Sequence, residues 1–383
     1  MLMIARRAVL IKLPRDKCDV DYVKRLMALA NLAYRGFEVW VPDVPRTIQH
    51  QLYGFRDFKD SLVFGTTPKR WFAETWVPLK TLRIYQDGSM KGDRTAPVIL
   101  DFEDDVIRLR QVCRNEHRYV VTIPMPRWVI DRIGEGGDVR FAMIGLENDE
   151  PYLALIAERV VEPYQPSNCM LVIDVNAWSN GVAWGLIRDG SIIRWKPERP
   201  RLSEIEGLYN ISVRLGRKYG RLKRLGLHKT VEGRRLWRNI KKVRRKIYAK
   251  LRDYAQKLVH RLVRKALKHR ALVIIDDMIE ESRRELLEEK IPRGLRKVYL
   301  AETRRFVKLL ITQLRWYGVP YEFKRLPSTI CPVCHHELTQ EEGRVMVCEN
   351  CGFKAPRDKI PIHWAMRELV REPGETCQEG DGG

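Results

Sequence analysis

The stretch "CPVCHHELTQEEGRVMVCENCGFKAPRD", from Cys331 to Asp358, contains two CxxC pairs separated by 13 residues. Four thiolates at this spacing are a donor set that tetrahedral Zn²⁺ prefers, and a site filled by four cysteines has no open position for catalysis. We therefore expect a structural zinc ribbon. Its expected ligands are Cys331, Cys334, Cys348 and Cys351. The acid that ends the stretch, Asp358, has to be explained by the rest of the chain.

The net charge, +22 over 383 residues, is concentrated in one segment. Between Ile211 and Arg270 there are 23 Lys and Arg residues and only two acids. A charge run is ordinarily a solvated helix face, but this face repels itself because few acids balance it. A local positive field of this kind attracts a polyanion. The residues that we expect to bind nucleic acid are Lys241, Lys242, Arg244 and Arg245.

The sequence contains no long apolar run, and its first residues lack the cleavage site of a secretory signal. The cysteines outside the ribbon are scattered, unlike the disulfide framework of a secreted domain. They are Cys18, Cys113, Cys169 and Cys377. We therefore expect a cytoplasmic protein with no membrane partner, whose oligomeric state stays open.

The two halves of the chain differ in their pattern. The first half contains short alternating strands separated by turn signals, which predict a wedge-type β-barrel over 1–12 and 80–165. A helical recognition insertion is expected over 13–79. The second half contains apolar strands around two long basic helices, with a break near "GLHKTVEG". The tail, 371–383, is polar and rich in glycine and is predicted to be disordered.

Three acids in the second half stand at the ends of predicted elements. Asp174 lies in the apolar strand "LVIDVN", Asp276 closes the strand "ALVIID", and Asp358 precedes the last helix. Carboxylates gathered in one place bind Mg²⁺ or Mn²⁺, and a pair of such ions catalyses phosphodiester hydrolysis. Each acid alone is equally explained as a turn residue or a helix N-cap. Sequence spacing does not bring the three together.

The order of these pieces resembles the RuvC-type, RNase H-like nuclease domain of the transposon-encoded TnpB family, relatives of compact type V CRISPR effectors. The motifs, over about Met170 to Val370, are "VIDVN", the basic helices, "VIIDDM", "WYGVPYEFKRLPSTICPVC" and "VCENCGFKAPRD". The resemblance implies an α+β multidomain chain whose RuvC-like α/β nuclease domain spans 166–330 and 352–370, with the zinc ribbon inserted at 331–351.

The same resemblance implies a function. It makes Asp174, Asp276 and Asp358 the catalytic acids and the ligands of Mg²⁺ or Mn²⁺, and it makes the chain a metal-dependent DNA endonuclease. The implied partners are a guide RNA and double-stranded target DNA. In guided systems base pairing reads the target while the protein contacts backbone and a short flanking motif.

Two departures from the family pattern leave alternatives open. The family's second acid is Glu, whereas this chain has Asp276 followed by Asp277, and strand alternation allows only one of them to face the site. Asn176 stands where the family has Gly. One alternative is therefore a nuclease-inactive RNA-guided DNA-binding protein that represses transcription. The other is a zinc-ribbon nucleic-acid-binding protein in which the acids are structural.

Overall fold

The computed structural model describes residues 2–34, 44, 48, 76–79, 82–86, 88–92, 96–113, 120–134, 137–147, 149–176, 181–276 and 292–370. The chain divides into two compact units, Met1–Val161 and Glu162–Gly383. Most of the predicted recognition insertion and all of the predicted tail lie outside the described residues. None of the helices in these ranges is long and apolar enough to cross a membrane.

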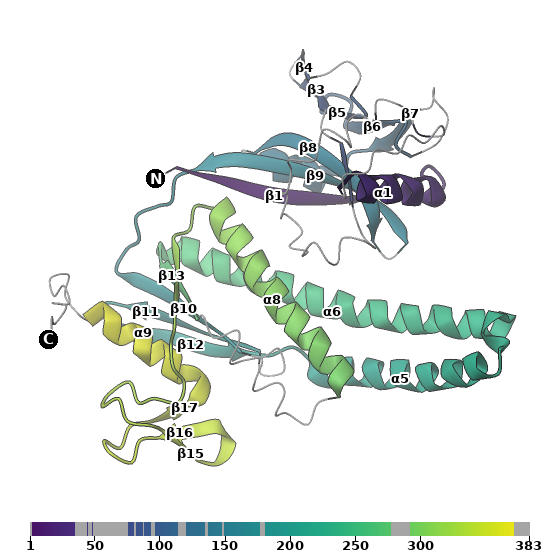
Figure 1. Ribbon diagram of the computed structural model, residues 1–383. Helices are drawn as coiled ribbons and strands as arrows, with labels where there is room; N and C mark the ends of the chain where they lie inside the picture. The colour runs from purple at the N-terminus through teal and green to yellow at the C-terminus, as the bar shows by residue number, and fades with distance from the viewer. Residues whose placement is uncertain are drawn as a thin grey trace, which may run out of the picture. The chain divides into compact units, whose positions relative to one another are not determined.

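The described residues of the first unit form strands and two helices, and strands such as β1 and β7 bury alternate residues (Figure 1). In order they are β1 (Met3–Lys12), α1 (Val20–Tyr34), β2 (Val77–Leu79), β3 (Leu82–Gln86), β4 (Ser89–Gly92), β5 (Val98–Asp101), β6 (Val106–Arg110), β7 (Val120–Pro124), α4 (Arg127–Gly134), β8 (Asp138–Glu147) and β9 (Glu150–Val161). One sheet has the strand order β1-β9-β8-β2, and the other has the order β4-β3-β5-β6-β7.

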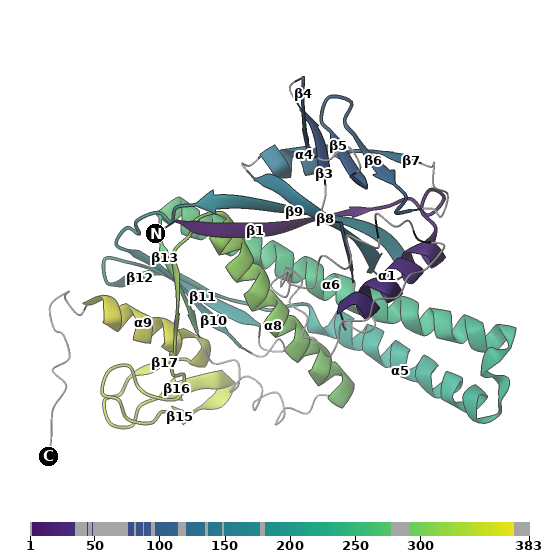
Figure 2. The same ribbon diagram turned by 45° about the horizontal axis from the view of Figure 1, so that its top comes forward.

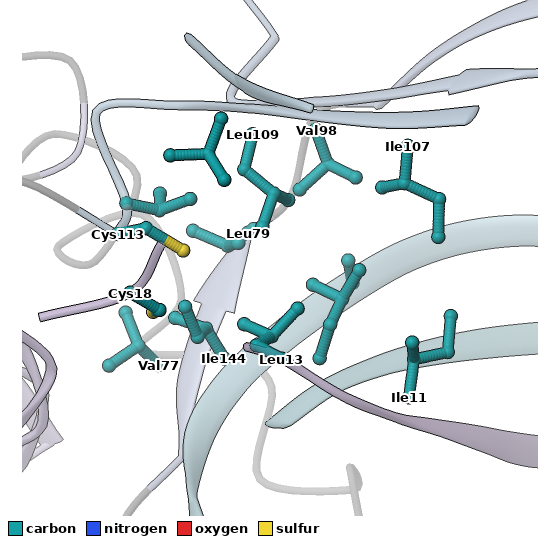
Figure 3. Packing of buried hydrophobic residues seen from close by; sticks show 14 of the residues in the cluster. Ile11, Leu13, Cys18, Val77, Leu79, Val98, Ile107, Leu109, Cys113 and Ile144 are labelled. Carbon is teal, nitrogen blue, oxygen red and sulfur yellow. The ribbon is translucent and has the colours of Figure 1, made fainter. Parts of the chain in front are cut away.

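The two sheets of the first unit share one hydrophobic core. Figure 3 shows Val98, Ile107 and Leu109 of the second sheet facing Leu79 and Ile144 of the first. The helix α1 adds residues at helical spacing, among them Val23, Leu26 and Ala30, to the same core. Within the described residues these strands form two sheets that share a core, and the wedge-type β-barrel expected over 1–12 and 80–165 stays a prediction. Alternating burial is common to both architectures, so the sequence pattern does not decide between them.

The second unit follows the predicted order of elements closely. They are β10 (Cys169–Val175), β11 (Val182–Arg188), β12 (Ser191–Glu198), α5 (Leu202–Arg224), η3 (Leu227–Lys229), α6 (Val231–His269), β13 (Leu272–Asp276), α8 (Arg293–Trp316), β14 (Tyr321–Lys324), β15 (Thr339–Gln340), η4 (Glu342–Arg344), β16 (Val345–Val347), β17 (Lys354–Pro356), η5 (Arg357–Lys359) and α9 (Ile360–Val370). Five of these strands form the sheet β12-β11-β10-β13-β14.

The central strand β10 is buried along its whole length because both faces of the sheet are covered. One face packs against α6 and α8 through Leu171, Ile173 and Ile275, and the other packs against α9 through Val172 and Ile274. This double burial explains why "MLVIDV" and "LVIID" are continuous apolar runs instead of alternating ones. β10 pairs antiparallel with β11 and parallel with β13.

The helices α5 and α6 form a long hairpin that extends away from the sheet in both views (Figures 1 and 2). Gly226, at a φ of 73°, and the cap of α6 make the break that "GLHKTVEG" predicted. The Thr230 hydroxyl accepts a hydrogen bond from the Gly233 N–H at 3.3 Å, which satisfies a free donor of the first turn. Ile247, Leu251 and later buried residues of α6 then follow helical spacing.

The ribbon forms a small sheet in the order β15-β16-β17. Because β17 pairs with β16, this sheet continues to Pro356, past the predicted boundary at residue 351. The ribbon is attached to α9 by side chains of that helix: Trp364 Nε1 donates to the Ile330 carbonyl at 3.0 Å, and Arg367 donates to the Val333 carbonyl at 3.0 Å. The position of α9 and the position of the ribbon are therefore linked.

Candidate active site

Asp174 and Asp276 lie on neighbouring strands at the same edge of the sheet. β10 and β13 are parallel, with Ile173 opposite Ile275, so the next residue of each strand is an aspartate. Strand alternation places both side chains on the face that carries Val172 and Ile274, which is the face that α9 covers. Asp277 lies outside the described residues.

Asp358 reaches the same place from a third segment. It lies in η5, directly before α9, and this helix packs on the sheet through Ile362 and Ala365. All three acids are buried, with exposed fractions of 4% for Asp174, 3% for Asp276 and 8% for Asp358. The structure therefore brings together three carboxylates from distant parts of the chain, which no spacing in the sequence requires.

The electrostatics of Asp174 follow from this crowding. Burial, the nearby charges of Asp276 and Asp358, and a hydrogen bond with Asp276 raise its pKa well above the ordinary carboxyl value, although Asn176 opposes the shift. Buried acids that repel one another favour a shared proton or a bound cation. A site of this kind fits a hard divalent cation, because its donors are carboxylate oxygens.

Hydrogen bonds fix the orientation of the first two acids. Asn176 Nδ2 donates to Asp174 Oδ2 at 2.7 Å, and the backbone N–H of Leu326 donates to Asp276 Oδ1 at 3.0 Å. Asn176, which departs from the expected glycine, thus has a defined role as a donor to the first carboxylate. Second-layer donors of this type orient metal ligands.

Two arginines that sequence analysis did not select contact the third acid. Arg344 donates to Asp358 Oδ1 at 2.9 Å, and Arg199 approaches Oδ2 at 3.5 Å. Arg344 belongs to the ribbon turn η4, and Arg199 follows β12. No motif distinguishes these arginines among the 71 basic residues of the chain, so only the folded structure identifies them.

The four ribbon cysteines converge as the spacing predicts. Their sulfur atoms all lie within 4.8 Å of one another, a donor set that could hold zinc. The residues after the two CxxC pairs, His335 and Gly352, adopt left-handed φ values of 64° and 73°, so the two turns are alike. Hydrogen bonding, first of all by Asn350, lowers the pKa of the Cys334 thiol to about 5, whereas the pKa of Cys351 is raised, against a backbone hydrogen bond at Phe353, by burial and by the other three thiols.

The four predicted nucleic-acid contacts lie on α6, and some have partners within the protein. Arg244 Nε donates to the Ser212 hydroxyl at 3.4 Å, and Lys241 lies over the Trp237 ring at 5.8 Å from its centroid.

A second row of exposed basic residues follows the helix at intervals of four residues. Its members are Arg234, Arg238, Lys242 and Lys246. Among the described residues no acid pairs with this row, which we call the α6 stripe.

No protein-family model and no curated protein matches the chain. Similar solved structures include Cas12f1 in complex with sgRNA and target DNA, with 9% identity, a TM-score of 0.48, and coverage of 94% of this chain and 79% of that chain. CasPhi-2 (Cas12j) bound to crRNA has 9% identity and a TM-score of 0.40, and covers 76% of this chain and 67% of that chain. The mini-RNA-guided endonuclease CRISPR-Cas phi3 has 9% identity and a TM-score of 0.33, and the match covers 60% of this chain and 57% of that chain. Because these TM-scores are below 0.5, function has to be argued from the residues of this chain.

Proposed function

We propose that this protein is an RNA-guided DNA endonuclease that cuts target DNA beside a short flanking motif by two-metal-ion phosphodiester hydrolysis. The observation that carries the proposal is the meeting of Asp174, Asp276 and Asp358 in one buried cluster. Three buried carboxylates repel one another, and this repulsion destabilises the fold unless positive charge or a proton offsets it. Arg344 and Arg199 pair with Asp358, and a bound cation would offset the remaining repulsion. The order of the pieces around them agrees with the TnpB-like nuclease domain.

The proposed chemistry assigns a role to each carboxylate. Asp174, Asp276 and Asp358 would hold Mg²⁺ or Mn²⁺, which when bound activates the attacking water and stabilises the leaving oxygen. Asn176 and the Leu326 N–H orient two of the acids through the hydrogen bonds at 2.7 and 3.0 Å. Asp276 is one methylene shorter than the expected Glu, yet its carboxyl is close enough to hydrogen-bond with that of Asp174.

The zinc ribbon has a structural role in this proposal. Its four cysteines would hold Zn²⁺ through four thiolates, which would leave no position for substrate. Its contacts with Trp364 and Arg367 hold the first turn of the ribbon on α9, the helix that follows Asp358. The ribbon therefore contributes to the placement of the third acid.

The α5–α6 hairpin is the proposed grip on the guide RNA or the heteroduplex. A sequence-independent grip requires positive charge along a phosphate backbone, and the α6 stripe provides it. The test is to change Arg234, Arg238, Lys242 and Lys246 to Ala and to measure RNA affinity over a range of salt concentrations. The slope of log affinity against log salt should fall by up to about 3. Arg→Lys and Lys→Arg exchanges at the same four positions keep the charge and should keep the slope.

The cutting activity is tested with the RNA that copurifies with the protein. Sequencing this RNA identifies the guide, and DNA complementary to the guide is then incubated with the complex and Mg²⁺. Wild-type protein should cut this DNA, Asp174→Asn should not, and Asp189→Asn, a change at an exposed turn, should behave as wild type. Guide-dependent binding without cutting by wild type would instead favour the repressor. Binding that needs no RNA would favour the simple zinc-ribbon protein.

A further inference from the structure

The ion pair between the ribbon and the acid cluster has a consequence for cation binding. Arg344 donates to one oxygen of Asp358 at 2.9 Å, and the more distant Arg199 approaches the other at 3.5 Å. Arg344 is the more buried of the two, with 30% of its side chain exposed against 52% for Arg199. Ion pairs strengthen as they are withdrawn from water, so Arg344 is the principal counter-ion of Asp358.

The pairing of Arg344 is incomplete. Its Nε is buried and, among the described residues, has no hydrogen-bond partner, so the guanidinium uses only part of its donor capacity. A guanidinium held in this manner can leave Asp358 at smaller cost than one in a bidentate, fully bonded pair.

We propose that Arg344 is a positioning residue that occupies Asp358 in the cation-free protein and competes with a divalent cation for this carboxylate. This inference rests on the proposed function, because it takes the three acids as the cation site. Removing the guanidinium frees an oxygen of Asp358 and makes the local field more negative, so the cation should bind more tightly. While the Arg344 guanidinium is present, cation binding depends on the position of the ribbon, because Arg344 belongs to the ribbon turn η4.

The test is a calorimetric titration of the zinc-loaded protein with Mn²⁺, without nucleic acid. Arg344→Gln should bind Mn²⁺ about tenfold more tightly than wild type, which corresponds to about 1.4 kcal/mol. Lys354→Gln is the matched control, because it removes one positive charge from the same ribbon. The Lys354 Nζ lies 2.6 Å from Glu341 Oε2 and pairs with that carboxylate, not with Asp358. The control should bind Mn²⁺ as wild type does. A second readout is the rise in melting temperature on addition of Mn²⁺, which should be larger in Arg344→Gln.

Two outcomes separate this inference from the proposed function. If Asp174→Asn binds Mn²⁺ as well as wild type, the cation site itself is wrong. If Asp174→Asn loses the binding but Arg344→Gln matches Lys354→Gln, the cation site stands and the competition is wrong. Zinc content verifies the fold of each variant. If Arg344→Gln does not retain zinc, Arg344→Met, which also removes the charge and keeps a long side chain, decides: tighter Mn²⁺ binding than wild type supports the competition, and unchanged binding contradicts it.

Discussion

Replacing Asp174 by Asn should stabilise the metal-free protein while it abolishes cutting. Two like charges about 4 Å apart repel by about 4 kcal/mol at an effective dielectric constant of about 20. The raised pKa of Asp174 means that its carboxyl keeps a proton to higher pH than an ordinary carboxyl does, which relieves part of this repulsion. We therefore expect the free energy of unfolding to rise by about 2 kcal/mol, or a melting temperature higher by roughly 4–8 °C.

The asparagine fits the site without rearrangement. Its amide oxygen can accept from Asn176 as Asp174 does now, and its NH₂ group can donate to Asp276 in place of the proton. No new buried group is left without a partner, so the change removes charge and little else.

The stabilisation by Asp174→Asn should depend on pH, and the direction of this dependence is a second prediction. A carboxyl whose pKa is higher in the folded state favours folding at low pH, and this contribution is lost as the pH rises through the folded-state pKa. The gain in the free energy of unfolding of Asp174→Asn over wild type should thus be largest at neutral pH. It should disappear as the pH falls to about 4, the ordinary carboxyl pKa. Melting curves recorded without divalent cations measure it, with Asp189→Asn as the control. A melting temperature equal to or below that of wild type at neutral pH would refute the reasoning.

Two further predictions concern the ribbon and the support of α9. Cys348→Ala should remove zinc from the protein, because three thiolates bind it much less tightly, whereas Cys169→Ala in β10 should leave the zinc content unchanged, as measured by metal analysis. Gly185→Ala should lower the free energy of unfolding by about 1–3 kcal/mol and reduce cutting, because the new methyl group would overlap Ile362 and displace α9 with Asp358. The matched change Gly207→Ala in α5, where a methyl group meets no atom within 4 Å, should stabilise the protein by about 0.5–1 kcal/mol.

The sequence predicted the elements of the second unit well because each one has a strong local signal. The apolar runs of β10 and β13, the helical spacing of Ile247 and Leu251, and the two CxxC turns are all set by neighbours in sequence. The order of the strands in the sheets of the first unit could not be read from the sequence, because it depends on long-range strand pairing that alternation leaves open.

The candidate site divides in the same way. The type and position of the acids could be read from the sequence, but their meeting depends on the parallel pairing of β10 with β13 and on the packing of α9. Arg344 was missed because its contact depends on the left-handed backbone of a ribbon turn. Of the α6 stripe, the sequence analysis selected only Lys242, because local charge density, and not helical position, guided the selection of Lys241, Lys242, Arg244 and Arg245.

The most direct test of the proposed cation site is anomalous diffraction from crystals of the protein soaked in Mn²⁺. Anomalous peaks are predicted between the carboxylates of Asp174, Asp276 and Asp358, apart from a zinc peak at the four cysteines. In crystals of Asp174→Asn the manganese peaks should be lost and the zinc peak kept. Manganese bound elsewhere, with none at the three acids, would contradict the account.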